Sequence, residues 1–151
     1  MKMLRLFSFI FFVMTNIACN DEETPQGLMN GSIECDVDGQ PWKATNTVTA
    51  LKDFEKLTII GRDGKEGGIA LYIPNSGLKS GTTIELAATG KGIIVAANKF
   101  TKTDGKEFYV TAGTITINNA TTNKAEGTFN FQGGDNGAVI NIDKGKFSVD
   151  F

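Results

Sequence analysis

The residues of this sequence that could do chemistry are mainly carboxylates, because the chain of 151 residues contains no histidine. Histidine is the commonest general base and metal ligand, so its absence excludes Ser-His-Asp and Cys-His arrangements within this chain. Asp36 and Asp38 have the spacing of two calcium ligands, but Pro41 and Trp42 interrupt the loop that a calcium site needs. No two carboxylates have a spacing that assigns them to one glycosidase site. The sequence therefore predicts a protein that is not an enzyme and has no metal and no cofactor.

Three aromatic residues, Trp42, Tyr72 and Tyr109, are the candidates for ligand binding. An exposed aromatic ring combines apolar area with a polar group, which suits stacking against a sugar. For Trp42 the alternative is a role as the central core aromatic of an N-terminal hairpin, since tryptophan is usually highly buried.

The first 19 residues have the layout of an export signal. Lys2 and Arg5 come first, an apolar run follows, and a small residue precedes Cys19. As a helix, residues 6–17 would span about 18 Å, which is too short for a membrane core of about 30 Å. The layout resembles a bacterial lipoprotein signal, although Asn16 stands where leucine is common; the resemblance implies that Cys19 is lipidated. An ordinary signal peptide that happens to contain a cysteine is the alternative.

Acidic residues at positions 21–23 follow Cys19 and resemble the signal that sends Bacteroidota-type lipoproteins to the outer leaflet. A solvated flexible tether would have the same composition. We therefore expect a signal peptide at 1–18, a lipidated tether at 19–30 and one β-domain at 31–151. The expected location is the cell outer membrane, with a lipid anchor and an exposed domain.

Cys35 has no partner for a disulfide bond if Cys19 carries lipid, because the chain has two cysteines. It shares one face of its segment with Ile33 and Val37. The sequence predicts a small buried apolar residue here and not a reactive thiol.

Apolar and polar residues alternate along most of the remaining chain, which is typical of half-buried antiparallel strands. The clearest case is the last third, 113–151, and further strands are expected at 32–37, 57–62, 69–73, 81–86 and 93–97. Turn signals separate the runs at Asp38-Gly39, Lys52-Asp53, Asp104-Gly105, Asn118-Asn119, residues 133–137 and Lys144-Gly145. The expected fold is all-β, an antiparallel meander of about ten strands that forms a sandwich or a barrel.

Two local features refine this picture. Phe108, Val110 and Ala112 are out of step with the isoleucines that follow, so a β-bulge is expected near Gly113. The glycine-rich stretch 61–68 lacks the ending of a phosphate-binding loop and precedes a strand, so it is expected to be a hairpin loop.

The order of several short motifs is similar to that of a family of small Bacteroidota lipoproteins grouped as domains of unknown function. The motifs are Asp36-x-Asp38-Gly39-x-x-Trp42-x-Ala44, Gly113-Thr114-Ile115-Thr116-Ile117, Gly127-Thr128-Phe129-x-Phe131 and Lys144-Gly145-x-Phe147. The resemblance covers nearly the whole chain after the signal, and implies a cell-envelope β-domain without assigning catalytic or binding residues.

The charge is nearly balanced, at −2 for the whole chain, and no basic patch with interleaved aromatics is present, so nucleic acid is not an expected partner. The function expected is a lipid-anchored envelope protein that binds or scaffolds a glycan or an envelope protein. One alternative is a calycin-like barrel that carries a small apolar ligand. Another is an envelope hydrolase, which would need acidic residues converging in a cleft with shifted pKa values.

Overall fold

The computed structural model describes residues 30–65, 67–87 and 98–151. These residues form ten strands and one short 3-10 turn, η1 (Asn75–Gly77). The strands are β1 (Gly31–Val37), β2 (Gln40–Lys43), β3 (Thr47–Lys52), β4 (Lys56–Arg62), β5 (Gly68–Pro74), β6 (Thr82–Ala87), β7 (Lys99–Thr101), β8 (Glu107–Ala120), β9 (Lys124–Asp135) and β10 (Ala138–Asp150). The signal peptide, Cys19, most of the tether and the strand expected at 93–97 lie outside the described residues.

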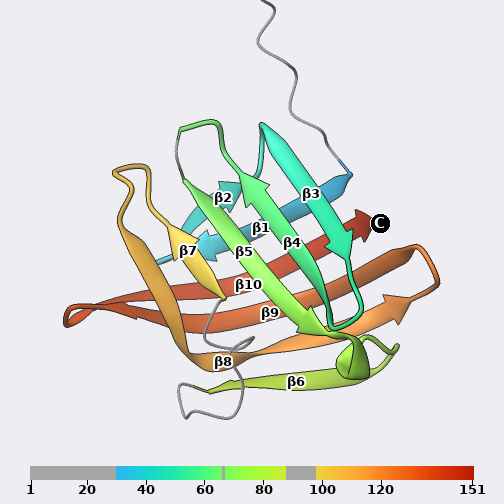
Figure 1. The fold of residues 1–151 in the computed structure, drawn as a ribbon. Helices are drawn as coiled ribbons and strands as arrows, with labels where there is room; N and C mark the ends of the chain where they lie inside the picture. Colours follow the sequence, from blue (N-terminus) through green and yellow to red (C-terminus); the bar gives the residue numbers. More distant parts are fainter. Residues whose placement is uncertain (1–29, 66, 88–97) are drawn as a thin grey trace, which may run out of the picture.

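The described strands pair antiparallel in one sheet, in the order β2-β1-β10-β9-β8-β7-β5-β4-β3, and β6 also pairs with β8. Figure 1 shows the sheet folded over, so that β3, β4 and β5 cross in front of β1, β10 and β9. The edge strands β2 and β3 are not neighbours in this order, so the sheet is not closed into a barrel. The all-β antiparallel prediction is confirmed, and a two-layered arrangement is the form that it takes.

The segment from Trp42 to Ala50 is divided between the two edges of the sheet. After β2 the backbone N–H of Ala44 donates to the carbonyl of Ile33 at 3.0 Å, and the chain then crosses to β3. Ala44, Val48 and Ala50 are buried and Trp42 is half-buried. Ala44, just after β2, and Val48 and Ala50 of β3 therefore face the interior from both edges of the sheet.

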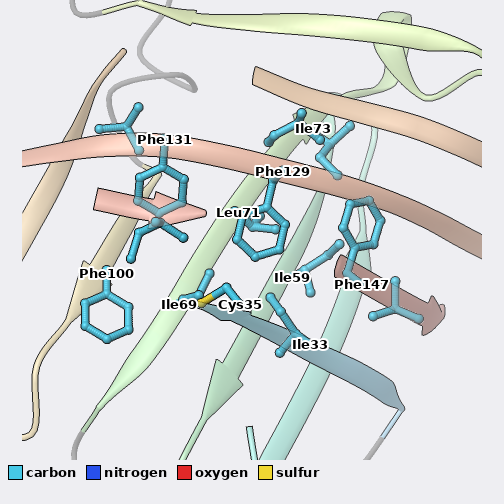
Figure 2. Packing of buried hydrophobic residues seen from close by; sticks show 14 of the residues in the cluster. Ile33, Cys35, Ile59, Ile69, Leu71, Ile73, Phe100, Phe129, Phe131 and Phe147 are labelled. Carbon is cyan, nitrogen blue, oxygen red and sulfur yellow. The ribbon is translucent and has the colours of Figure 1, made fainter. Parts of the chain in front are cut away.

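Apolar side chains from both layers fill the space between them (Figure 2). Phe129 and Phe147 come from β9 and β10, and Ile59 and Leu71 come from the facing strands β4 and β5. Each of these side chains is at most 3% exposed. Removal of apolar area from water is the main stabilising contribution in such a core. A carrier of an apolar ligand would need open space here, and in the described part of the protein side chains occupy it.

The bulge predicted near Gly113 is confirmed, slightly earlier in the chain. The pairing of β8 with β9 shifts between Val110 and Ala112. Ala112 is consequently exposed and does not share the buried face of Phe108. At the same place the other edge of β8 changes its partner from β7 to β6. The bulge thus lies where the sheet divides.

Lys144 and Gly145 form a bulge and not the predicted turn. Strand β10 continues through them, and its pairing with β9 shifts there while Lys144 adopts a φ of 52°. An inserted residue moves the apolar positions from even to odd numbers, which in a sequence looks like a new strand after a turn. Asn118 and Asn119 likewise lie inside β8, at a second shift in its pairing with β9.

Three glycines of the long strands lie directly opposite phenylalanines on the neighbouring strand. An added Cβ would lie 2.5 Å from the Phe129 ring at Gly145 and 2.6 Å from the Phe147 ring at Gly127. The glycines therefore make room for the buried rings, which cover the exposed backbone in return. The pairs are Gly113 with Phe131, Gly127 with Phe147 and Gly145 with Phe129.

Candidate functional site

Tyr72 and Tyr109, two of the three predicted binding residues, come to the same region of the outer sheet face. Tyr72 lies on β5 between the buried Leu71 and Ile73, so it points away from the interior. Tyr109 is 46% exposed and lies directly opposite Lys99 of β7. Because β7 pairs with both β5 and β8, Lys99 is placed between the two tyrosines.

Lys99, Glu107 and Tyr109 form a connected group. The ammonium of Lys99 donates to Oε1 of Glu107, and the hydroxyl of Tyr109 donates to Oε2 of the same carboxylate at 2.5 Å. The Lys99 ammonium also lies 5.6 Å from the centre of the Tyr109 ring, within cation–π range. The Glu107 carboxylate thus holds both the Lys99 ammonium and the Tyr109 hydroxyl in place.

These contacts shift the pKa values of the group in consistent directions. The hydrogen bonds from Lys99 and then Tyr109 lower the pKa of Glu107. The hydrogen bond to Glu107 raises the pKa of Lys99, and donation to the same carboxylate raises the pKa of Tyr109. The carboxylate is therefore held ionised and the tyrosine is held protonated at neutral pH.

A groove with a volume of about 250 Å³ lies beside this group. We call it the outer-face groove. Small residues and an aliphatic side chain form its apolar part, and Tyr72 together with charged side chains completes it. Its main lining residues are Ile60, Arg62, Gly68, Ala70, Tyr72, Lys99 and Glu107.

Arg62 brings a cation to the groove from β4. Among the described residues none forms an ion pair or a side-chain hydrogen bond with its guanidinium. Lys99 is neutralised by Glu107, whereas Arg62 offers free donors in a planar fork that matches a carboxylate. The groove therefore has one cation available for an anionic group.

Asn98, which sequence reasoning missed, positions the groove from the interior. It is fully buried, its Oδ1 accepts from the backbone N–H of Tyr72 at 2.7 Å, and its carbonyl accepts from the N–H of Val110. The Asn98 side chain thus takes the place of a backbone carbonyl in the ladder between β5 and β7. It does so directly before β7 begins at Lys99. In the sequence, the one indication of a role for Asn98 is that this polar residue directly follows the apolar run 93–97.

Trp42, the third predicted binding residue, lies apart from the groove. Its ring is half-buried and meets Phe100 edge-on, with centroids 5.8 Å apart and planes at 84°. Its indole N–H donates to Asp63 at 3.2 Å. A separate cleft of about 280 Å³ lies beside it, and Asp104 and Lys102 also line that cleft. The contacts of Trp42 resemble those of the core aromatic that was the alternative reading.

The carboxylates of Asp36 and Asp38 contact strand β10, and the backbone of Asp38 forms the hairpin turn. Asp36 pairs with Lys144 at 2.7 Å, and Asp38 Oδ1 accepts from the N–H of Asn141 at 2.9 Å. Positive φ values at Asp38 (49°) and Gly39 (79°) are those of a tight hairpin turn. Within the described residues no three candidate ligands come together as a metal site.

Cys35 is buried, as the sequence predicted. Burial is the main cause that raises the pKa of its thiol to about 12, and the nearby charges of Asp36 and Glu34 act in the same direction. It is therefore a packing residue and not a nucleophile.

The fold is an antiparallel β-domain, and one of its outer faces carries a groove lined by aromatic, aliphatic and charged residues. The chain belongs to the family described as a domain of unknown function, DUF6252, whose profile matches residues 29–149. No curated protein and no solved structure matches the chain. The described residues include no helix that is long and apolar enough to cross a membrane.

Membership of this family confirms that the ordered motifs belong to a domain of unknown function, whereas the lipoprotein part of the resemblance stays a prediction. The structure gives those motifs a packing role, because their glycines face the buried phenylalanines of neighbouring strands and Asp38-Gly39 forms a turn. The outer-face groove contains none of the motif residues.

Proposed function

We propose that the protein is a non-enzymatic, lipid-anchored component of the cell outer membrane whose β-domain binds a glycan in the outer-face groove. The observation that carries the proposal is the convergence of Tyr72, Arg62 and Lys99 from three strands on one solvent-facing groove. The signal-like N-terminus that ends at Cys19 supports the anchor.

A sugar ring fits the chemistry of this groove. The small residues Gly68 and Ala70 leave room above the sheet, and Tyr72 offers a ring face beside them. Hydroxyl groups can bond to Glu107 and to the free donors of Arg62. Because Arg62 has no acidic partner in the described chain, a sugar acid gains an additional charged hydrogen bond.

Binding without catalysis agrees with the state of Glu107. A general acid of a glycosidase needs a raised pKa, whereas the pKa of Glu107 is lowered by Lys99 and Tyr109. Among the described residues that line the groove, Glu107 is also the one carboxylate. These features favour recognition over hydrolysis.

The test is glycan binding by the purified chain, measured by titration calorimetry with a uronate-containing polysaccharide and a neutral one. We expect Tyr72→Ala to weaken binding at least about fivefold, through lost stacking area. Arg62→Gln should weaken binding of the uronate polymer more than that of the neutral one. Phe54→Ala and Lys43→Ala are matched controls, since neither residue lines the groove. Binding that survives Tyr72→Ala, or no binding to any glycan, would reject the proposal.

The anchor and the exposure are tested in cells. Cys19→Ala should release the protein from the membrane fraction or leave it unprocessed, and unchanged fractionation would reject lipidation. Protease shaving of intact cells, with a tag placed after Phe151, should remove the tag if the domain is outside. Full protection until lysis would instead favour a scaffold role with an envelope-protein partner.

A further inference from the structure

An apolar patch lies at the end of the domain that carries the β3–β4 turn. We call Leu51, Phe54 and Phe151 the Phe54 patch. Leu51 is 66% exposed and Phe54 is completely exposed, at 105%. A shallow cleft of about 550 Å³ lies among these residues, and the ammonium of Lys52 lies 5.2 Å from the centre of the Phe151 ring. Exposed apolar groups gathered at one place indicate a contact surface.

The turn is built so that Phe54 stays outside. Oδ1 of Asp53 accepts from the N–H groups of Glu55 and Lys56 at 2.7 and 2.9 Å, and the Asp53 N–H donates to the Lys56 carbonyl. Asn75 holds the same turn from η1, because its amide donates to the Asp53 carbonyl and its N–H donates to the Glu55 carbonyl. The ring could not turn inward without loss of these bonds.

The start of the described chain lies next to the segments that carry the patch. The N–H of Asn30 donates to the carbonyl of Val48 in β3, and the carbonyl of Asn30 accepts from the N–H of Asp150, which directly precedes Phe151. Ten residues separate Cys19 from Asn30, a length that spans at most about 35 Å. A lipid on Cys19 would therefore keep the Phe54 patch within reach of the bilayer.

We infer that the Phe54 patch is a membrane contact, in which Phe54 and Leu51 enter the headgroup region of the bilayer that holds the Cys19 lipid. This inference rests on the lipid anchor of the proposed function. Lys52 lies beside the turn and can meet lipid phosphates, while the Asp53 carboxylate is occupied by backbone N–H groups and by Lys56. Phe54 lies at the opposite end of β4 from Arg62, so the contact leaves the outer-face groove open to solvent.

The experiment uses the full lipidated chain in vesicles of phosphatidylethanolamine and phosphatidylglycerol. A Phe54→Cys variant takes an environment-sensitive fluorophore selectively, since Cys35 is buried and the lipid blocks Cys19. Val139→Cys is the matched control, an exposed apolar position (59%) near the other end of the long strand β10. We expect spin-labelled lipid to quench the probe at position 54 at least about threefold more than the probe at position 139.

The possible outcomes distinguish the membrane contact of the Phe54 patch from the lipid anchor on which it rests. Equal quenching at both positions, in a chain that stays with the vesicles, would overturn the membrane contact and leave the anchor intact. A chain that does not partition into vesicles would overturn the anchor and the inference together. If the probe at position 54 is shielded from water in detergent, and sedimentation shows dimers, the Phe54 patch is a contact with a second copy of the chain. That result would reject the lipid contact.

Discussion

The indole N–H of Trp42 donates a hydrogen bond to Oδ2 of Asp63, 3.2 Å away. The other carboxylate oxygen, Oδ1, accepts from the N–H groups of Lys65 and Gly67 in the β4–β5 loop. A side chain at position 67 would displace this carboxylate, because a Cβ there would lie 2.4 Å from Oδ2. Asp63 therefore joins the β4–β5 loop to the ring that closes one end of the core over Phe100.

Asp63→Ala should lower the free energy of unfolding by about 2 kcal/mol, since it removes three hydrogen bonds at a partly buried position. The check is urea unfolding followed by the fluorescence of Trp42, the single tryptophan. Asp104→Ala is the control, because the Asp104 carboxylate accepts one bond, from the N–H of Lys106, in an exposed turn. Equal small losses in both variants would show that the Trp42 contact adds nothing.

Gly145→Ala should destabilise the domain by about 1–3 kcal/mol, because the new methyl group would overlap the Phe129 ring and its carbonyl at 2.5 Å. Gly137→Ala is the comparison. No atom lies within 4 Å of a Cβ at Gly137, so its cost of about 1 kcal/mol comes from its φ of 85°. Thermal unfolding of both variants checks the prediction, which fails if Gly145→Ala is the milder change.

The periodicity of the sequence was enough to predict the faces of the strands, because alternation depends on residues two apart. Phe129, Phe131 and Ile142 are buried as expected. The sequence could not predict that one strand continues through Lys144 and Gly145, because a bulge and a turn reset the alternation of apolar residues in the same way.

The site was harder to predict than the fold. Tyr72 and Tyr109 were candidates as single residues, but their proximity depends on β7 lying between β5 and β8 in the sheet. Strand β6 lies between β5 and β7 in the sequence and pairs elsewhere, so the order in the chain gives no indication of this arrangement. Lys99 and Glu107 gain their roles from cross-strand register, which the sequence does not specify by itself.

Cys35 should resist thiol reagents in the folded protein. With its pKa raised to about 12 by burial, about one thiol in ten thousand is ionised at pH 8, and the side chain is also buried. In a Cys19→Ala chain, a chromogenic disulfide reagent should react within minutes in guanidinium and very slowly without it. Fast reaction of the folded chain would contradict the buried position. Because the folded pKa is raised above the usual 9.0, this thiol contributes stability below pH 9 that is lost as the pH rises towards 12.

Lys99→Met should raise the pKa of Glu107 towards the usual glutamate value of 4.5, because the hydrogen bond from Lys99 is the largest cause of the present lowering. Tyr109→Phe should raise it less, since the Tyr109 hydroxyl is the second cause. A titration of the carboxyl carbon by NMR measures both changes. Glu126 is an internal control, because its pKa is lowered by Lys124 and should not respond to either substitution.

The sign of the accompanying stability change follows from the lowered pKa of Glu107. The folded state holds the ionised form more strongly than the unfolded chain, so the contribution is present above pH 4.5 and is lost as the pH falls through the folded pKa. Lys99→Met should therefore unfold at a lower temperature than the parent chain at neutral pH, and the two melting temperatures should approach each other in acid. A constant difference at every pH would assign the effect of Lys99 to packing against Tyr109 and not to its charge.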